Sequence, residues 1–425
     1  MTAETTENII IFNEGNIPVK IISVFCIILI FFILSGCSSV PIVKTGEYRE
    51  YGFIIADEKH MQNVKALYQA GDPETGLLVT ELVKTAEKAM TNSLLSVTDN
   101  GQIPRFGDIH DYYSIAIYWW PNKLFRNGKP YIMKDGMRNP EYLEYDLPLL
   151  EKMSSDFRNL SLAFYYTDKP DYALRAAEIL RHWFINPETA MNPNMKYASS
   201  IPGICSGTGS GIIESISFPL KIIDGILILK KSAVLKKSEI TALEKWFSDF
   251  LDWLVTSGSG REQSMRTNNL ATYYWMEVIT IGLFCGNQDA AEKAVQKAAG
   301  LFQRQIKSGG SQPAELRRTK SFEYSVFNLE GWFYLASAAE KLGYDFWNFQ
   351  PKNGCSLKSA LEYLTVYLEK GEKWPHRNIT DPDVNLLYPL LYISGRKIDP
   401  DFGLLTDLLT ESPGLSYKKY LMLLL

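Results

Sequence analysis

The sequence NLATYYWMEVITIGLFCGNQDAAEKAVQKAAGLF, residues 269–302, indicates the fold of the whole chain. Its first part, Asn269 to Cys285, is an apolar and aromatic run of helical length. Its second part, Asp289 to Phe302, places apolar residues on one helical face, at Ala291, Ala294, Val295, Ala298 and Phe302. Because only a short connection separates the two parts, we expect an antiparallel pair of helices.

The rest of the chain repeats this pattern. Helical periodicity or apolar runs of helical length predict helices from residue 57, at 77–90, from 149, at 170–185, 212–229, 238–255, 326–342, around 357–364, and at 384–393 and 402–409. We find no convincing run of alternating strand residues. The predicted class is therefore all-α, with antiparallel helix pairs arranged as a solenoid or as an incomplete or closed (α/α) toroid over residues 57–425.

The N-terminal segment has the features of a bacterial lipoprotein signal. Lys20 precedes an apolar run, Ile21 to Leu34, which is short for a membrane span, and the run ends in Leu34-Ser35-Gly36-Cys37. This tetrapeptide resembles a lipobox, in which cleavage precedes an acylated cysteine. We expect residues 1–37 to be the signal segment, Cys37 to be the lipidated residue and residues 38–56 to be a tether. The alternative is an uncleaved anchor. Either would hold the chain at a bacterial cell envelope.

Composition narrows the classes of function. The net charge of −4 gives no basic footprint for nucleic acid. The four histidines do not pair at metal-ligand spacing, and Cys205, Cys285 and Cys355 form no CxxC motif. We therefore expect neither a transition-metal site nor a cofactor. The aromatic content of 13% fits either a carbohydrate-binding cleft or a large aromatic core.

A long irregular stretch, residues 101–141, is rich in glycine, proline and aromatic residues. A loop of this length inside a compact domain is functional or disordered, and the many aromatics argue against disorder. We expect an ordered loop over a cleft, with these side chains against a substrate: His110, Tyr112, Tyr113, Trp119 and Trp120.

Two further stretches could carry chemistry. In the first, Asn268 and Asn269 stand where a helix begins, so one of them could simply cap it, or Asn269 could direct its amide at a substrate carboxylate. Asn268 and Tyr274 are expected to contact the substrate as well. The second stretch contains Arg317, Arg318 and Tyr324.

Arg317 and Arg318 precede Tyr324. A guanidinium donates two parallel hydrogen bonds to a carboxylate, and a nearby cation would help a tyrosine to act as a base. The alternatives are a solvated basic patch and a core tyrosine. Helical phase over seven residues would favour Arg317 as the neighbour of Tyr324.

These groups suit β-elimination of a uronate. The reaction removes the C5 proton next to a carboxylate, and charge develops on that carboxylate. Asparagine and arginine donors would stabilise this charge, and a tyrosine could take the proton and protonate the leaving O4.

Several motifs, in order, resemble the alginate lyase superfamily of helical polysaccharide lyases. They are Gly107–Ser114, Tyr118–Pro121, Gly128–Tyr131, Asp135-Gly136, Trp183–Thr189, Met191–Asn194, Ile201–Gly203, Gly211–Ile213, Asn268-Asn269, Arg318-Thr319 and Tyr324–Glu330. The resemblance implies an α/α toroid that cleaves alginate or a related polyuronate.

Carried over from the family, Asn269 would neutralise the carboxylate, Tyr324 would be the acid and base, and Arg317 or Arg318 would assist. The Arg-Thr dipeptide of the motif favours Arg318. In such lyases a histidine typically follows the asparagine pair, whereas this chain has Leu270. One alternative is therefore a catalytically impaired lipoprotein that binds acidic glycans.

A second alternative is a toroid-shaped hydrolase with two carboxylates. Its candidates are Asp108, Asp111 and Glu214.

Overall fold

The computed structural model describes residues 40–48, 52–369, 373–409 and 423–424. The predicted lipidation site, Cys37, and the signal segment lie outside these residues. The chain divides into two compact units, Met1–Val40 and Pro41–Leu425. Every described helix and strand belongs to the second unit.

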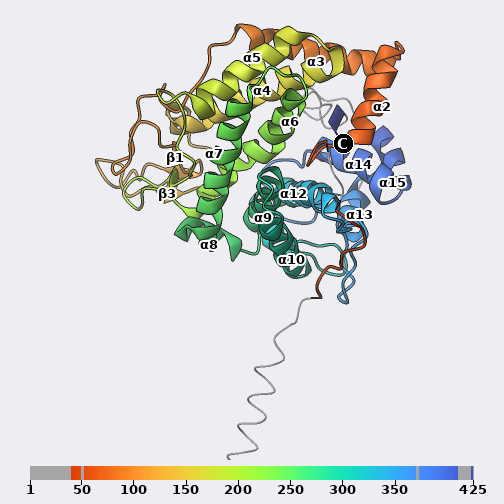
Figure 1. Cartoon of the computed structure of the whole chain (residues 1–425). Helices are drawn as coiled ribbons and strands as arrows, with labels where there is room; N and C mark the ends of the chain where they lie inside the picture. The colour runs from red at the N-terminus through yellow and green to blue at the C-terminus, as the bar shows by residue number, and fades with distance from the viewer. Residues whose placement is uncertain (1–39, 49–51, 370–372, 410–422, 425) are drawn as a thin grey trace, which may run out of the picture. The chain divides into compact units, whose positions relative to one another are not determined.

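The second unit is built mainly from helices (Figure 1). The α-helices are α2 (Glu58–Gln69), α3 (Pro73–Thr91), α4 (Asp146–Thr167), α5 (Pro170–Leu180), α6 (Asp224–Lys230), α7 (Lys237–Thr256), α8 (Gly258–Ser264), α9 (Asn269–Phe284), α10 (Gln288–Gln305), α11 (Pro313–Leu316), α12 (Ser321–Lys341), α13 (Leu357–Glu369), α14 (Tyr388–Lys397) and α15 (Asp401–Leu404). Shorter 3₁₀ and π segments are η1 (Pro140–Glu144), η2 (Arg181–Ile185), η3 (Gly209–Ile216), η4 (Phe218–Ile223), η5 (Val384–Leu387) and η6 (Leu405–Leu408).

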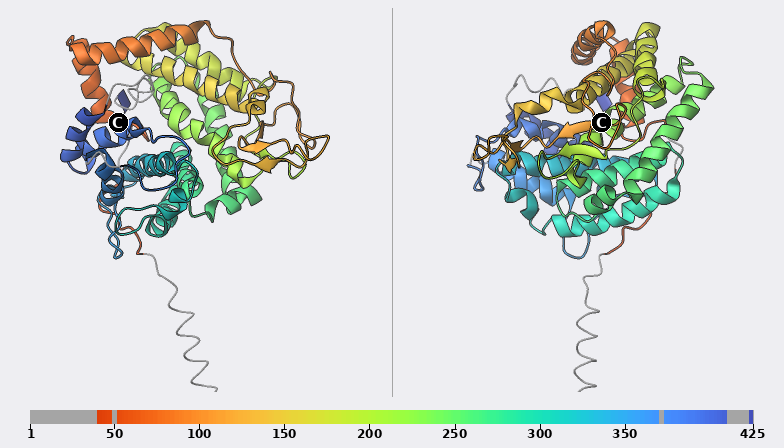
Figure 2. Two further views of the ribbon diagram at one scale, coloured as in Figure 1. Left: turned by 180° about the vertical axis from the view of Figure 1, so that it is seen from behind. Right: turned by 90° about the vertical axis from the view of Figure 1, so that its left-hand side faces the viewer.

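Successive helices pack as pairs, as the sequence predicts. Helix α4 packs against α3 and α5, and α9 packs against α10 and α12 (Figures 1 and 2). The mostly helical architecture confirms the predicted all-α toroid class. One predicted helix, residues 212–229, is instead a succession of η3, η4 and α6, because Pro219 falls inside the run and disturbs regular α-helical hydrogen bonding.

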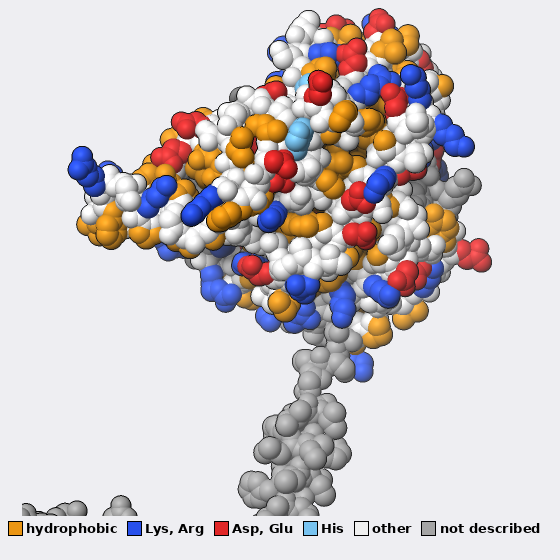
Figure 3. All heavy atoms as spheres, turned by 60° about the vertical axis from the view of Figure 1, so that its left-hand side comes forward, with side chains coloured by type: hydrophobic (Ala, Val, Ile, Leu, Met, Phe, Trp, Pro, Cys, Tyr) orange, Lys and Arg blue, Asp and Glu red, His pale blue; other side chains and the backbone are white. Residues whose placement is uncertain are grey.

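The described chain also contains short strands, which the sequence analysis did not predict. Strand β1 (Tyr113–Ile115) pairs in parallel with β4 (Tyr197–Ser200), and β2 (Trp119–Trp120) pairs antiparallel with β3 (Ile132–Met133). Strands of two to four residues are too short to show alternation. They order the long loop of residues 101–141. Hydrophobic and charged side chains lie side by side on the face that Figure 3 turns toward the viewer.

Helices α9 and α12 form the centre of the core, and both are buried along most of their length. They approach closely at Gly331, where a Cβ atom would lie 2.9 Å from the Tyr273 ring. The Tyr273 ring stacks on Phe327 with 4.4 Å between the ring centroids, and its hydroxyl donates to the Phe327 carbonyl oxygen. A glycine at position 331 therefore sets the distance between the two helices.

A buried amide network joins the same helices. Gln305 Oε1, at the end of α10, accepts hydrogen bonds from Thr272, Asn328 and Trp332 at 2.9–3.0 Å. Gln305 Nε2 donates to the Asn268 carbonyl at 2.8 Å. The network thus connects the start of α9 with the interior of α12.

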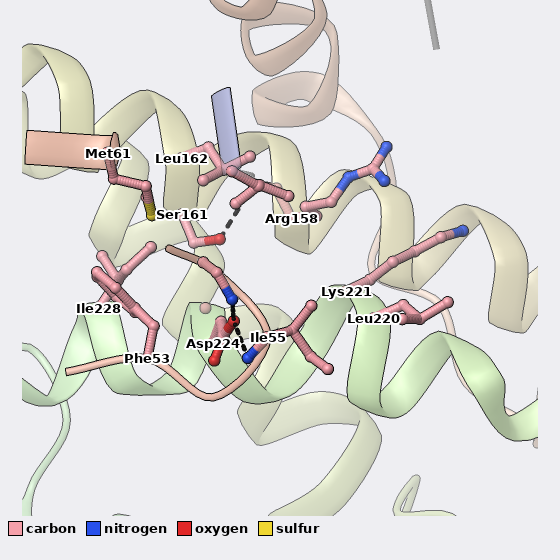
Figure 4. A pocket seen from close by; sticks show the side chains of 13 residues that line it. Phe53, Ile55, Met61, Arg158, Ser161, Leu162, Leu220, Lys221, Asp224 and Ile228 are labelled. Carbon is pink, nitrogen blue, oxygen red and sulfur yellow. Dashed lines mark hydrogen bonds between the residues drawn. The ribbon is translucent and has the colours of Figure 1, made fainter. Parts of the chain in front are cut away.

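The described residues of the segment expected to be a tether are packed against the helices. The backbone N–H groups of Ile54, Ile55 and Ala56 donate to the buried carboxylate of Asp224 at 2.7, 3.0 and 2.8 Å. Figure 4 shows Asp224 beside Ile55. Farther upstream, the N–H groups of Thr45 and Gly46 donate to the Gly343 carbonyl at 2.9 and 3.1 Å. The tether prediction is therefore wrong for the described residues of this segment, because apolar residues 53–56 are buried in the core.

No helix in the described part of the chain combines the length and the apolar character needed to cross a bilayer.

We predict that Asp224→Asn destabilises the protein. An amide oxygen keeps an acceptor, but its NH₂ group turns a donor toward backbone donors, so the free energy of unfolding should fall by about 1–3 kcal/mol. Urea unfolding measures this loss. The control is Asp249→Asn, which removes only a surface pair with Lys245 and should cost under about 1 kcal/mol. Equal losses in the two variants would contradict the anchoring role of Asp224.

Candidate active site

Tyr324 lies in the first turn of α12, which begins five residues before the predicted start. Its hydroxyl donates to the hydroxyl of Tyr118 at 2.9 Å. Tyr118 comes from the long loop, immediately before β2. A loop residue and a helix residue 206 positions apart therefore share one phenol pair.

Arg318 lies against the ring of Tyr324, with the guanidinium carbon 3.6 Å from the ring centroid. Its Nη2 and Nε atoms donate to Asp135 at 2.6 and 3.3 Å. The backbone N–H and hydroxyl of Thr319 also donate to Asp135, at 3.1 and 3.0 Å. Asp135 thus fixes the guanidinium in place beneath the phenol ring.

Gly136 allows this approach between loop and helix. It adopts φ +78°, and a Cβ atom there would lie 2.7 Å from the Thr319 hydroxyl oxygen. A side chain at position 136 would therefore push Asp135 away from Arg318.

The argument from helical phase, which favoured Arg317 over Arg318, does not apply in this structure. Helix α11 ends at Leu316 and α12 begins at Ser321, so no continuous helix connects Arg317 with Tyr324. Arg317 is exposed at the C-terminal cap of α11. Arg318, which the Arg-Thr dipeptide favours, is the arginine that contacts the tyrosine.

Asn269 is 2% exposed, and its donors face a carboxylate of the protein. Its backbone N–H and its Nδ2 donate to the two oxygens of Glu315, at 2.8 and 2.7 Å. An amide NH₂ carries two hydrogens, so one Nδ2 hydrogen remains beyond the bond to Glu315. Asn269 is therefore oriented by α11 rather than by its own helix.

Asn268 occupies the N-cap position of α9, but its side chain makes no capping hydrogen bond. Its Oδ1 atom is buried without a hydrogen-bond partner among the described residues. The simple interpretation of a capping asparagine at this helix start is therefore not realised.

Leu270 follows Asn269 in the first turn of α9 and is partly buried. Its carbonyl oxygen accepts a hydrogen bond from Gln263 at 3.1 Å.

The charges around Tyr324 act in opposite directions. Burial raises the pKa of Tyr324, and Tyr118 adds to this rise, whereas Arg318 lowers it; the net direction is upward. Tyr324 is consequently a protonated phenol at neutral pH in the free protein. Burial also raises the pKa of Glu315, although Asn269 and Arg318 oppose that rise.

Asp135 shows the opposite balance. Burial disfavours its charged form, but the bonds from Arg318 and Thr319 outweigh burial and lower its pKa to about 2. Asp135 and Arg318 therefore form a charged pair at neutral pH.

Two of the expected substrate-contacting aromatics point into the core. Tyr112 is fully buried and donates to Glu214 at 2.8 Å, and Tyr274 is buried and donates to the Leu254 carbonyl at 3.2 Å. Direct contact between either of them and a substrate is therefore not supported. The partly exposed members are His110, Tyr113, Trp119 and Trp120.

The carboxylates considered for a hydrolase have structural partners. Glu214 is buried and accepts hydroxyl hydrogen bonds from Tyr112, Ser114 and Ser199 at 2.6–2.8 Å. Asp111 accepts from Asn192 at 2.9 Å, and Asp108 is exposed. Glu214 is thus committed to the core and is not free to act on a glycosidic bond.

Sequence reasoning did not assign three residues that complete the site: Tyr118, Asp135 and Glu315. The first two belong to the quoted motifs Tyr118–Pro121 and Asp135-Gly136, so the motifs held a signal for them. Glu315 carries no such signal, because its partner Asn269 is 46 positions away.

Two cavities lie away from these residues. One, of about 20 Å³, is lined by Phe53, Met61, Asp224 and Leu424 among others (Figure 4). The other, of about 290 Å³, is lined by residues of α2 and α3, the end of α4 and the connection between α4 and α5. Within the described residues, no group of three or more His, Cys, Asp and Glu side chains is placed to hold a metal ion.

The comparisons with family profiles and with solved structures point to the same family. The sequence profile of the family described as alginate lyase matches residues 96–374. The crystal structure of an alginate lyase from Bacteroides ovatus has a TM-score of 0.82 and 30% sequence identity, covering 87% of this chain and 98% of that one. The comparison with curated protein sequences finds no match.

More distant structures share the fold. A histidine-to-alanine variant of alginate lyase A1-III complexed with tetrasaccharide has a TM-score of 0.58 and 15% identity, covering 87% of this chain and 93% of that one. Alginate lyase A1-III from Sphingomonas species A1 has a TM-score of 0.53 and 14% identity, covering 83% of this chain and 90% of that one.

We predict that Asp146 makes stability depend on pH. Burial raises its pKa to about 8 in the folded state, with Glu214 adding to the rise. The folded chain keeps this proton between about pH 4 and 8 while the unfolded chain loses it, so the free energy of unfolding should fall as pH rises, by about 1.4 kcal/mol per unit. Urea unfolding across this range measures the slope.

The matched variant is Asp146→Asn, which cannot titrate. The dependence of its unfolding free energy on pH should be weaker by about 1.4 kcal/mol per pH unit, which corresponds to one proton. Some dependence should remain, because the other buried carboxyls still contribute. Parallel curves for the two proteins would show that Asp146 keeps an ordinary pKa in the folded state.

Proposed function

This chain belongs to the alginate lyase family, and from that premise we propose that it cleaves alginate or a related polyuronate by β-elimination. The observation that carries the proposal is the stacking of Arg318 against Tyr324, with the two groups 3.6 Å apart. It places a cation directly beside a proton-transfer group, an arrangement that stabilises the charged form of the phenol.

Tyr324 supplies the proton transfers in this proposal. As a phenolate it takes the C5 proton; the electron pair of that C–H bond forms the C4–C5 double bond, and the C4–O4 bond breaks. The leaving O4 then takes the proton back from Tyr324. Because burial holds the resting phenol protonated, its proton must first pass to water, and Arg318 favours the charged ring oxygen that remains.

The donors around Tyr324 stabilise the charge that develops on the substrate carboxylate. Asn269, held by Glu315, contributes its remaining Nδ2 hydrogen, and exposed Arg317, two residues after Glu315, contributes positive charge. Arg318 stays with Asp135 and acts mainly on the phenol. Tyr118 positions the Tyr324 hydroxyl by accepting its hydrogen bond.

We also propose that the protein acts at a bacterial cell envelope, anchored by a lipid on Cys37. The support is the apolar run that ends in Leu34-Ser35-Gly36-Cys37. An envelope lyase would meet polyuronates or their fragments as they reach the cell.

The second candidate is a glycan-binding lipoprotein with little or no lyase activity. Two observations favour it: Leu270 offers no donor or proton acceptor, and Asn269 already donates to Glu315. Binding of polyuronate without an unsaturated product would support this function over cleavage.

We predict that Tyr324→Phe lowers lyase activity by about 10²–10⁴-fold, because the proton-transfer group is lost while the ring and its contact with Arg318 remain. The assay follows the ultraviolet absorbance of the unsaturated product from alginate, glucuronan and related polyuronates. Tyr118→Phe should retain more activity, since it removes only the partner of the Tyr324 hydroxyl. Tyr68→Phe, on α2, is the control and should be unaffected. Activity that persists in Tyr324→Phe would refute the tyrosine mechanism.

A separate prediction concerns Leu270→His. An imidazole at this position of α9 can donate to a carboxylate or accept a proton, so activity should rise or extend to further polyuronates. Leu270→Gln, a polar side chain without a proton-transfer group, is the control. No gain with any substrate in the folded histidine variant would show that position 270 does not limit this site.

A further inference from the structure

The loop that supplies Tyr118 to the site continues into an exposed basic and apolar segment, residues 119–138, which we call the arm. It comprises β2, β3, their connection and the residues that lead to η1. The arm contains five cations, Lys123, Arg126, Lys129, Lys134 and Arg138. Its only acidic residue is Asp135, which is paired with Arg318. A net charge of about +4 is thus concentrated in a chain whose overall charge is −4.

The same segment exposes large hydrophobic side chains. Leu124 is 88% exposed and Phe125 is 52% exposed, both at the turn between β2 and β3. Ile132, Met133 and Met137 are also exposed. Scattered exposed hydrophobics need no explanation, but Leu124 and Phe125 are adjacent at one turn and form a patch of the kind that marks an interaction surface, with three more exposed hydrophobics within 14 residues. The face of the molecule that Figure 3 shows carries hydrophobic and cationic side chains next to one another.

The exposed tip is held in place by regular hydrogen bonds. The Asn122 N–H donates to the Gly128 carbonyl at 2.8 Å, and the Gly128 N–H donates to the Phe125 carbonyl at 2.9 Å. The base of the arm is fixed as well, because the Tyr131 N–H donates to the Pro202 carbonyl at 3.1 Å. A fixed turn therefore presents Leu124 and Phe125 to solvent, and the patch does not arise from a frayed loop.

The chemistry of the patch selects its partner. Polyuronates and anionic lipid surfaces both attract cations, but they differ in what they offer to aliphatic side chains. Leucine, isoleucine and methionine gain little from a hydrated sugar, whereas they gain from entering the acyl boundary of a bilayer. Cations beside them would meet anionic headgroups. Among the described residues, none of the five cations of the arm forms an ion pair that would compete.

We propose that the arm docks on an anionic phospholipid surface, with Leu124 and Phe125 entering the interface and the flanking cations contacting headgroup phosphates. Trp120 lies at the rim of this surface. Lys134 Nζ lies over its ring, 4.7 Å from the ring centroid. Tryptophan and lysine are the side chains that favour the headgroup level of a bilayer. This proposal does not depend on the lyase activity.

The test is hydrogen–deuterium exchange of the full chain on vesicles. One set is pure phosphatidylcholine and the other is half phosphatidylglycerol; any N-terminal anchor holds the chain on both, so the arm is the variable. We expect exchange in peptides covering residues 122–133 to slow several-fold on the anionic vesicles alone, and the effect to fade as salt is raised.

Variants make the result specific. Leu124→Ser combined with Phe125→Ser should abolish the protection, and Lys123→Glu combined with Arg126→Glu should do the same. Leu77→Ser on α3, which removes a 71% exposed leucine outside the arm, should leave it intact. Both arm variants alter exposed side chains, and circular dichroism verifies that they fold.

Two results would overturn the proposal. Equal exchange rates in the arm on both kinds of vesicle would show that an anionic lipid surface is not its partner. Protection by alginate oligosaccharides, with none by anionic vesicles, would assign the arm to the substrate instead.

Discussion

The side-chain amide of Gln305 is the contact on which the geometry of this site depends. It accepts hydrogen bonds from α9 and α12 and donates to the carbonyl of Asn268, so it fixes the two helices that carry Asn269 and Tyr324. An amide buried without partners is costly, so the network favours one relative placement of these helices. Gly331 allows the close approach that the network requires.

Next to these two helices, the positive charge of Arg318 is largely offset by neighbouring carboxylates. Arg318 is balanced by Asp135 on one side and interacts electrostatically with Glu315 on the other. The compensation keeps a partly buried guanidinium tolerable beside a phenol when no substrate is bound. In the proposed reaction, a sugar carboxylate would therefore enter a site whose strongest cation already has a partner.

Periodicity was sufficient to predict most of the long helices, because long amphipathic or apolar runs determine their own secondary structure, but it missed the break at Pro219. It was not sufficient for the site. Arg317 and Arg318 could be distinguished only once the break between α11 and α12 was known, and the bond from Asn269 to Glu315 depends on folding across 46 residues. Tyr112 and Tyr274 show the same limit: the aromatic residues of a loop or helix do not reveal which of them face the core.

The ion pair between Asp135 and Arg318 spans 183 residues and ties an exposed arm to the interior of the site. The arm therefore cannot be exchanged between related proteins without affecting the contact between Arg318 and Tyr324. A graft that omitted Asp135, or replaced Gly136 with a bulkier residue, would release the guanidinium that lies under the tyrosine. A change in the exposed arm therefore also changes the surroundings of the Arg318–Tyr324 pair.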